Sequence, residues 1–399
     1  MFSERIPTVR ISPDNATVLS QLGLLKDLAG SWHGKGFNLV ARPFFGSPTA
    51  TPPIPPANLF LELNLTHETL KFDPISSSIP NRGTFQEDIE LFGLTYLQKI
   101  SDATTGGALH IEPGIWVTQP PTTNPPVSPP PTGQIVARMG SIPHGNALLA
   151  GGSATPFKGP PVIGTGGGVA NPAFSAFPSF NSGPIAVPAP TTPPVPPAPL
   201  IIRAAGTQES LAVAGGGFSQ YNLSIPPSLT TTPPNPRTPL GNTPAVLPAA
   251  ITQQLVNDPI VLLQQTIAEQ VADGCQFEGT VLNIATSSPL TFFTTPPTAP
   301  PAGGPTVPIT VQDFAGGPGN LPFLETNADS ALVYATFWIE KVTPKDGRPF
   351  MQLQYAQFVL LNFPAVLIPS TAPPPASDQG KLNFSWPHVS VATLRKTFG

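Results

Sequence analysis

The stretch NLFLELNLTHETLKF, residues 58–72, alternates apolar and polar side chains over almost its whole length. Leu59, Leu61, Leu63 and Leu65 recur at every second position, which places four leucines on one face. Successive side chains of a β-strand point to opposite faces, whereas a helix repeats its apolar positions every three or four residues. The stretch therefore predicts a long strand.

Strand-like stretches with polar turns between them recur along the chain, whereas helical patterns are rare. Strands joined in this way favour an antiparallel barrel or sandwich over alternating strands and helices. The further predicted strands are EDIELFGLTYLQKI (87–100), GALHIEPGIWVTQ (107–119), GQIVARMGSI (133–142), QFEGTVLNIATS (276–287), SALVYATFWIEKV (330–342), MQLQYAQFVLLNF (351–363) and SWPHVSVATLR (385–395).

Two short helices are expected. The first covers residues 13–30, with Asp14 or Asn15 as its cap and Gly30 at its end. The second follows Asp258 as N-cap and Pro259 at the first helical position. Its apolar face repeats at helical spacing until Gly274 ends the helix; that face consists of Ile260, Leu263, Ile267 and Val271.

Proline is the outlier of the composition. The chain of 399 residues holds 58 Pro and 36 Gly, while only 10% of its residues are charged. Proline cannot donate to a strand ladder, so the proline-rich stretches 51–56, 119–131 and most of 153–250 are expected to be loops or extended arms. We expect one enlarged β-domain over 1–399, with a Pro/Gly-rich insertion at 151–320 wrapped on or beside it.

Charge and apolar patterning bear on partners and location. The net charge is −4 and no cluster of Lys and Arg stands out, so nucleic acid and anionic membranes are not expected partners. The N-terminal segment lacks the apolar run of a signal peptide, and the longest apolar run, 358–369, is too short and too broken to span a bilayer. A cytoplasmic protein is expected, and a homo-oligomer remains open. Cys275 is the one cysteine, which excludes an internal disulfide.

Glycine-rich stretches do not support nucleotide chemistry. GNALLAGGSA (145–154), GTGGGVA (164–170) and AVAGGGF (212–218) lack the Lys-Ser/Thr of a phosphate-binding loop and its strand-to-helix setting. Loop glycine is the simpler interpretation of all three.

The five histidines are the main candidates for site chemistry: His33, His67, His110, His144 and His388. A lone histidine in a strand is more often a hydrogen-bonded core or surface residue than a ligand. His67 stands among polar residues and is expected to face water.

Three motifs, in this order, resemble the nitrobindin family of haem-binding β-barrels. They are Gly-x-Trp-x-Gly-x-Gly in LAGSWHGKGF (28–37), His-x-Glu-x-Gly in LHIEPGIW (109–116), and a terminal strand with His388 in PHVSVATLRK (387–396). The resemblance implies an antiparallel up-and-down β-barrel of about ten strands with one or two short helices, to which this chain adds long proline-rich loops. The stretch between about 150 and 320 has no counterpart in compact members.

The same resemblance implies roles for particular residues. His388 matches the family's haem-iron ligand, and His110 matches the histidine on the other side of the pocket. Trp32, Gly34 and Gly36 match the opening motif, where tryptophan fills the floor. The family binds ferric haem and reacts with nitrogen oxides, so haem b is the expected cofactor and an isomerase or peroxidase-type activity is open.

Alternation and context give further expectations. Glu112 lies two residues after His110 and can orient it, or it can be a solvated carboxylate. His144 in SIPHGN is a turn residue that can reach over the barrel mouth. If Trp32 points inward, His33 points outward. The Trp338–Glu340 face, and Tyr355 with its neighbouring glutamines, are expected to line the barrel.

Three functions of different classes follow. The first is a haem protein that acts on nitrogen oxides or peroxide. The second is a lipocalin-like carrier or cofactor-free enzyme whose barrel holds an apolar small molecule. The third is a partner-binding protein that uses its proline-rich arms. The first is favoured over the second if His388 and His110 face each other across one cavity.

Overall fold

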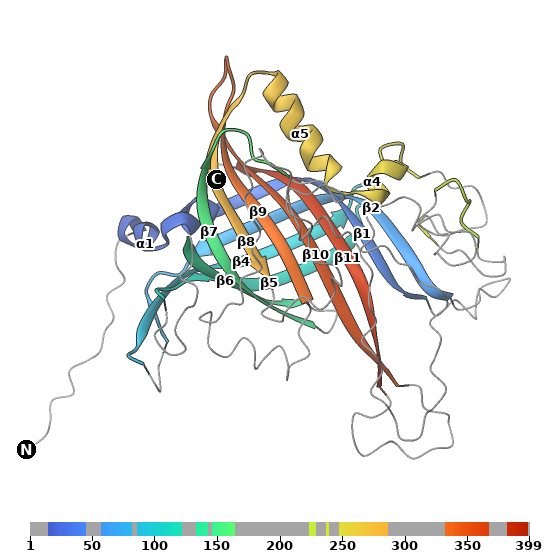
Figure 1. Ribbon diagram of the computed structural model, residues 1–399, viewed down its shortest axis with the longest axis horizontal. Coiled ribbons are helices and arrows are strands. Elements are labelled where there is room, and N and C mark those ends of the chain that lie inside the picture. Colours follow the sequence, from blue (N-terminus) through green and yellow to red (C-terminus); the bar gives the residue numbers. More distant parts are fainter. Residues whose placement is uncertain are drawn as a thin grey trace, which may run out of the picture.

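The alternating stretch 58–72 lies within strand β2 (Ala57–Pro74), one wall of a closed β-barrel (Figure 1). The computed structural model describes residues 15–44, 57–81, 86–121, 133–142, 146–163, 223–228, 237–238, 247–285, 332–366 and 381–397. The other strands are β1 (Gly30–Phe44), β3 (Ile79–Asn81), β4 (Ile89–Asp102), β5 (Ala108–Thr118), β6 (Gln134–Ile142), β7 (Asn146–Lys158), β8 (Gln276–Ala285), β9 (Leu332–Thr343), β10 (Phe350–Val366) and β11 (Lys381–Thr397).

The strands follow one another around the barrel in nearly the order of the sequence. All pairings between the strands are antiparallel, β11 returns to pair with β1, and β2 pairs with β4. Short β3 pairs with β4 outside this ring, so ten strands close the barrel. The predicted all-β, up-and-down barrel is confirmed.

The first predicted helix is split, and it plugs one end of the barrel. Helix α1 (Asn15–Gln21) is followed by the 3-10 helix η1 (Gly23–Leu28), because Gly23 adopts a positive φ of 55° between them. Leu22, Leu25 and Leu28 of this segment are fully buried among the side chains of the barrel interior. The Trp32 indole donates a hydrogen bond to the Leu28 carbonyl at 2.7 Å, which fixes the plug to β1.

Two other helices, α4 (Gln253–Asn257) and α5 (Val261–Ala272), precede β8. Helix α5 begins two residues later than predicted, because the Asp258 carboxylate accepts from the Ile260 amide before the helix starts. It ends near Gly274 as expected, where φ is 76°. Val271, predicted to belong to the packed face, is 45% exposed.

The barrel wall carries an apolar core on each of its two sides. The inner core joins the plug to residues such as Trp32, Trp116 and Phe337. The outer core packs Leu61 and Leu63 of β2 against α4 and α5, together with Phe37, Leu39, Ile251, Leu255, Leu263 and Ile267. Leu61, Leu63 and Leu65 therefore face outward, and the polar side chains that alternate with them line the interior.

Three expectations about individual segments are wrong. A loop is expected at 145–154, but residues from Asn146 onward form β7 (Asn146–Lys158). Gly152 lets the backbone of β8 approach so closely that a Cβ would lie 1.8 Å from the Asn283 carbonyl oxygen. Trp338 belongs to the outer core, and Glu340 lies on the same side. Gln352 and Gln354, the glutamines expected to line the barrel, also point outward and contact α5. Tyr355 does point inward.

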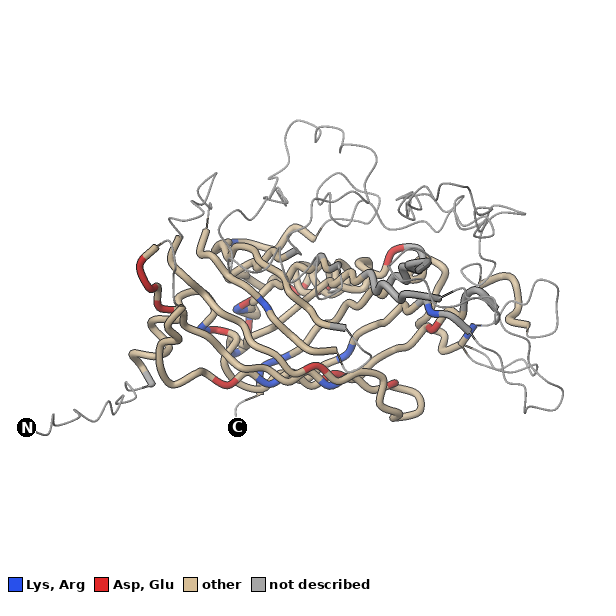
Figure 2. The backbone as a smooth tube through the Cα atoms, turned by 90° about the horizontal axis from the view of Figure 1, so that it is seen from below, with Lys and Arg blue, Asp and Glu red and all other residues tan. Residues whose placement is uncertain are grey.

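Several predicted features lie outside the described residues, including the proline-rich stretches 51–56 and 122–131 and most of 164–246. Part of the expected insertion at 151–320 returns to the barrel, since it contains the end of β7, α4, α5 and β8. The domain boundaries stay a prediction. None of the described helices is long and apolar enough to cross a membrane. Charged residues are sparse along the described backbone (Figure 2).

Glu340 is a buried carboxyl group beneath α5. Its side chain is fully buried, and one oxygen accepts from the Gln352 amide at 2.6 Å, while Gln352 in turn exchanges hydrogen bonds with Gln270 of α5. The other oxygen is buried with no hydrogen-bond partner among the described residues. Burial raises the pKa of Glu340 to about 8, against the opposing effect of Gln352.

Replacing this carboxyl is expected to remove a pH dependence of stability. The folded state keeps the Glu340 proton up to about pH 8, whereas the unfolded chain loses it near 4.5, so the free energy of unfolding falls across that range. The loss is on the order of 4 kcal/mol. Urea unfolding at pH 5 and pH 9 should show that Glu340→Gln loses much less stability than wild type. Glu278→Gln, an exposed carboxylate on β8, is the control; equal pH slopes in Glu340→Gln and wild type would contradict the assignment.

Candidate functional site

The barrel interior contains a cavity of about 450 Å³. On β1 its lining begins at Asn38 and continues to Val40 and Arg42, beyond the plugged end at Trp32. This volume lies within the range of small-molecule pockets in proteins. The cavity is therefore the main candidate site.

His388 and His110 both line this cavity. His388 lies on β11 and His110 on β5, and four steps around a ring of ten strands separate these strands, so the two residues stand on nearly opposite walls. In the strand register His388 lies between Val40 of β1 and Val359 of β10, which also line the cavity. The His388 side is thus flanked by apolar groups, whereas the His110 side is polar.

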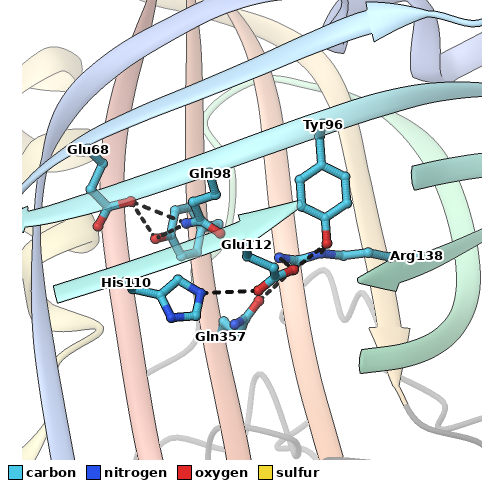
Figure 3. Close-up of polar contacts among 8 residues, drawn as sticks. Glu68, Tyr96, Gln98, His110, Glu112, Arg138 and Gln357 are labelled. Atoms are coloured by element: carbon cyan, nitrogen blue, oxygen red, sulfur yellow. Dashed lines mark hydrogen bonds and ion pairs between the residues drawn. The ribbon is translucent and has the colours of Figure 1, made fainter. Parts of the chain in front are cut away.

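A buried ion pair stands beside His110 (Figure 3). The Arg138 guanidinium donates to the Glu112 carboxylate at 2.7 Å, and both side chains are almost completely buried. Tyr96 donates to the same carboxylate oxygen, and Arg138 also donates to Gln357 at 2.5 Å across the interior. A ring nitrogen of His110 lies 3.3 Å from the other Glu112 oxygen.

The charges of this cluster stabilise each other. Burial alone would raise the pKa of Glu112, but the Arg138 cation and hydrogen bonds from His110 and Tyr96 lower it to about 2. Burial alone would lower the pKa of Arg138, and Glu112 raises it above its usual range. The rings of Tyr96, Trp116 and Phe337 lie within 6 Å of the guanidinium and add cation–π contacts. Glu112 is consequently a fixed anion that can orient His110.

A second carboxyl group, Glu68, is buried on the inner face of β2. Tyr355 donates to it at 2.6 Å and Thr66 at 2.9 Å, and Gln98 links the same group through a 3.0 Å hydrogen bond to Tyr355. Burial raises the pKa of Glu68 despite these hydrogen bonds. The interior therefore holds two glutamates whose pKa values are displaced in opposite directions, a combination that is common at sites of proton transfer.

A row of polar side chains lies next to the row formed by Val40, His388 and Val359. Ser390, Asn38 and Asn64 are register partners on β11, β1 and β2, and all three line the cavity. Asn64 donates to Asp102 at 3.0 Å. Asn38 is 5% exposed, and its amide oxygen has no hydrogen-bond partner among the described residues. A buried amide without a partner is costly unless a ligand or water satisfies it.

The structure places the predicted site residues in two regions. His388, His110 and Glu112 come together at the cavity, and Glu112 lies on the same face as His110, as alternation predicts. Trp32 is fully buried at the plugged end, while His33 and His67 are exposed on the outer face as expected.

Gly34 and Gly36 are not cavity-lining residues. A Cβ at either position would lie within 2.3 Å of a β11 carbonyl oxygen, so these glycines allow β1 and β11 to approach closely. His144 lies outside the described residues.

Sequence reasoning missed Arg138, Glu68, Tyr96, Gln98 and Asn38. A signal existed for Arg138, the single charge within the otherwise apolar and small-residue stretch QIVARMGSI. Glu68 belongs to the polar face of β2, and the polar face of an alternating strand is normally expected to face water. Only the outward direction of Leu61 and Leu63 shows that this face is buried.

The resemblance to nitrobindin gains no independent support. Comparison of the chain with known protein families, with curated proteins and with solved structures finds no match. Among the described residues, no group of three or more His, Cys, Asp or Glu side chains is arranged to hold a metal ion. The barrel itself is established, and the haem, the reaction and the site roles stay predictions.

Removing the Arg138 cation is expected to destabilise the barrel strongly. Arg138→Met leaves the Glu112 carboxylate buried without its counter-ion, which costs about 3–5 kcal/mol of unfolding free energy. Chemical denaturation at pH 7 measures this loss. The matched control is Lys341→Met, which breaks an ion pair of the same 2.7 Å length between exposed side chains and should have a much smaller effect. Similar losses of unfolding free energy in the two variants would show that burial does not determine how much the Glu112–Arg138 pair contributes to stability.

Proposed function

We propose that the protein binds ferric haem in the interior cavity through His388 and handles nitrogen oxides or peroxide there. The observation that carries the proposal is the placement of His388 and His110 on nearly opposite walls of one cavity of about 450 Å³. Haem ligation of this kind needs one imidazole from the protein, rather than a cluster of metal ligands.

The lining suits the two faces of such a cofactor. On the His388 side, Val40 and Val359 offer apolar contacts to a macrocycle. On the other side, His110 is oriented by Glu112 and can donate or accept a proton next to a small bound molecule. When bound, haem would supply an open coordination position for a diatomic gas or peroxide.

A second candidate is a cofactor-free enzyme or a lipocalin-like carrier that holds an organic molecule in the same cavity. The observation that favours an enzyme is the pair of buried glutamates with oppositely displaced pKa values, Glu68 and Glu112. A carrier for a purely apolar molecule is less suited to this lining, because Gln98, Asn38 and the Glu112 carboxylate all reach the cavity surface.

An absorption titration of the purified protein with ferric haem tests the first proposal. We expect a saturable shift of the Soret band in wild type and its loss in His388→Ala, because the variant lacks the axial imidazole. His67→Ala removes an exposed histidine from the outer face and should titrate as wild type does. Added free imidazole should restore the shift in His388→Ala, which separates a missing ligand from a damaged fold.

Either of two results would overturn the haem proposal. One is the absence of a saturable shift in folded wild-type protein. The other is an identical shift in His388→Ala. Binding of an organic fluorescent probe without any haem shift would favour the second candidate.

A further inference from the structure

A second concave site lies on the outer face of the barrel, over β1, β2, β4 and the start of β5. This groove has a volume of about 880 Å³. Its exposed lining includes His33 and Lys35 of β1, His67 of β2 and Lys99 of β4. Strands position all four side chains, so the groove is a rigid surface of the sheet.

The sheet register brings these side chains into two adjacent rows. His33 lies opposite Thr69, and Thr69 lies opposite Lys99. One pleat further along β1, Lys35 lies opposite His67, which in turn lies opposite Ser101. Neighbouring strands are about 4.8 Å apart and alternate residues about 7 Å apart, so one small ligand can contact both rows.

The groove lacks the acidic partners that balance lysines elsewhere on the barrel. On β9, Lys341 lies directly opposite Glu278 and is paired with it at 2.7 Å. Among the described residues, neither Lys35 nor Lys99 has such a partner. The cross-strand neighbours of Lys35 are Thr393 and His67, and those of Lys99 are Thr69 and Ile111.

The positive charge of the groove is not balanced by an exposed carboxylate of its own lining. Opposite charges on neighbouring strands stabilise an antiparallel pair, whereas Lys35 lies directly opposite the His67 imidazole and not opposite a carboxylate. One carboxyl group, Glu68, does border the groove, but it is 3% exposed and hydrogen-bonded to Tyr355 inside the barrel. A bound anion would balance the lysine charges that no exposed side chain of the groove lining balances.

One end of the groove is apolar. Ala108, Leu109 and Ile111 of β5 line this end, and Ile111 is 44% exposed, one of the most exposed large apolar residues described. Ile111 is the register partner of Lys99, so apolar and cationic groups are side by side.

We propose that this outer groove binds a small organic phosphate, with the phosphate between Lys35, Lys99 and the two histidines and an apolar body against Ile111. Lysine binds phosphate as a point charge, and the Thr69 hydroxyl, 3.4 Å from His33 Nδ1, can supply an additional donor. A concave volume of 880 Å³ suits a small molecule, whereas a flat basic patch would suit a membrane or nucleic acid. The site is distinct from the interior cavity and does not depend on haem.

Fluorescence titration with 1-naphthyl phosphate tests the proposal, since this probe carries both groups. We expect saturable binding to wild type that weakens as salt is raised. Removal of both lysines in Lys35→Gln/Lys99→Gln should weaken it roughly tenfold or more, equivalent to about 1.4 kcal/mol. Inorganic phosphate and 1-naphthol each lack one half of the probe and should each bind more weakly than the whole.

A matched pair of lysines gives the control. Lys158→Gln/Lys345→Gln removes the same charge from exposed positions on β7 and on the β9–β10 turn, and should bind the probe as wild type does. Three outcomes would overturn the proposal: no saturable binding, equal weakening in the two double variants, or binding that survives in Lys35→Gln/Lys99→Gln but is lost in His388→Ala. The last result would place the probe in the interior cavity. None of these three outcomes changes the expected result of the haem titration. Each proposal can therefore be overturned without overturning the other.

Discussion

The Glu112–Arg138 ion pair is the constraint around which the barrel interior is organised. Removing two charges from water costs several kcal/mol for each ion, and the attraction between them compensates only when their other hydrogen-bonding groups are satisfied. Here Tyr96 of β4, Gln357 of β10 and His110 of β5 complete the cluster. Since Arg138 belongs to β6 and Gln357 to β10, the cluster links opposite sides of the barrel and requires a polar region at its centre.

Where the centre of the barrel is polar, the apolar face of β2 is the outer one. Glu62, Asn64, Thr66 and Glu68 occupy the inner face of β2, so the leucines that alternate with them, Leu61, Leu63 and Leu65, are buried on the outer side. An outward row of leucines is stable only if something covers it, and α4, α5 and residues Leu223 and Leu247 supply that cover. The segments between β7 and β8 are thus part of what allows the barrel to keep a polar interior.

Local patterns were sufficient to predict most of the strands, because alternation with a period of two is a property of neighbouring residues. His110 and Glu112 could be paired for the same reason, as they are two residues apart on one strand. The local patterns left a barrel and a sandwich as alternatives, and they missed β7. Alternation does not predict which face of a strand points into the barrel, because both sides of the barrel wall carry apolar cores. Arg138 and Tyr355 reach their glutamates across 26 and 287 residues of sequence, and no local pattern encodes such contacts.

The same strands bear both candidate sites, one on each face. The β4–β5 register shifts between Ile100 and Ser101, and Leu109 is the extra residue on β5. Ile100, Ala108, Leu109 and His110 consequently border both the cavity and the outer groove. At this bulge one layer of backbone separates the two sites, and the His110 ring, which Glu112 orients, faces the interior cavity. A rearrangement of the bulge would change the shape of both linings, whereas the Glu112–Arg138 pair holds the adjoining part of β5 in place.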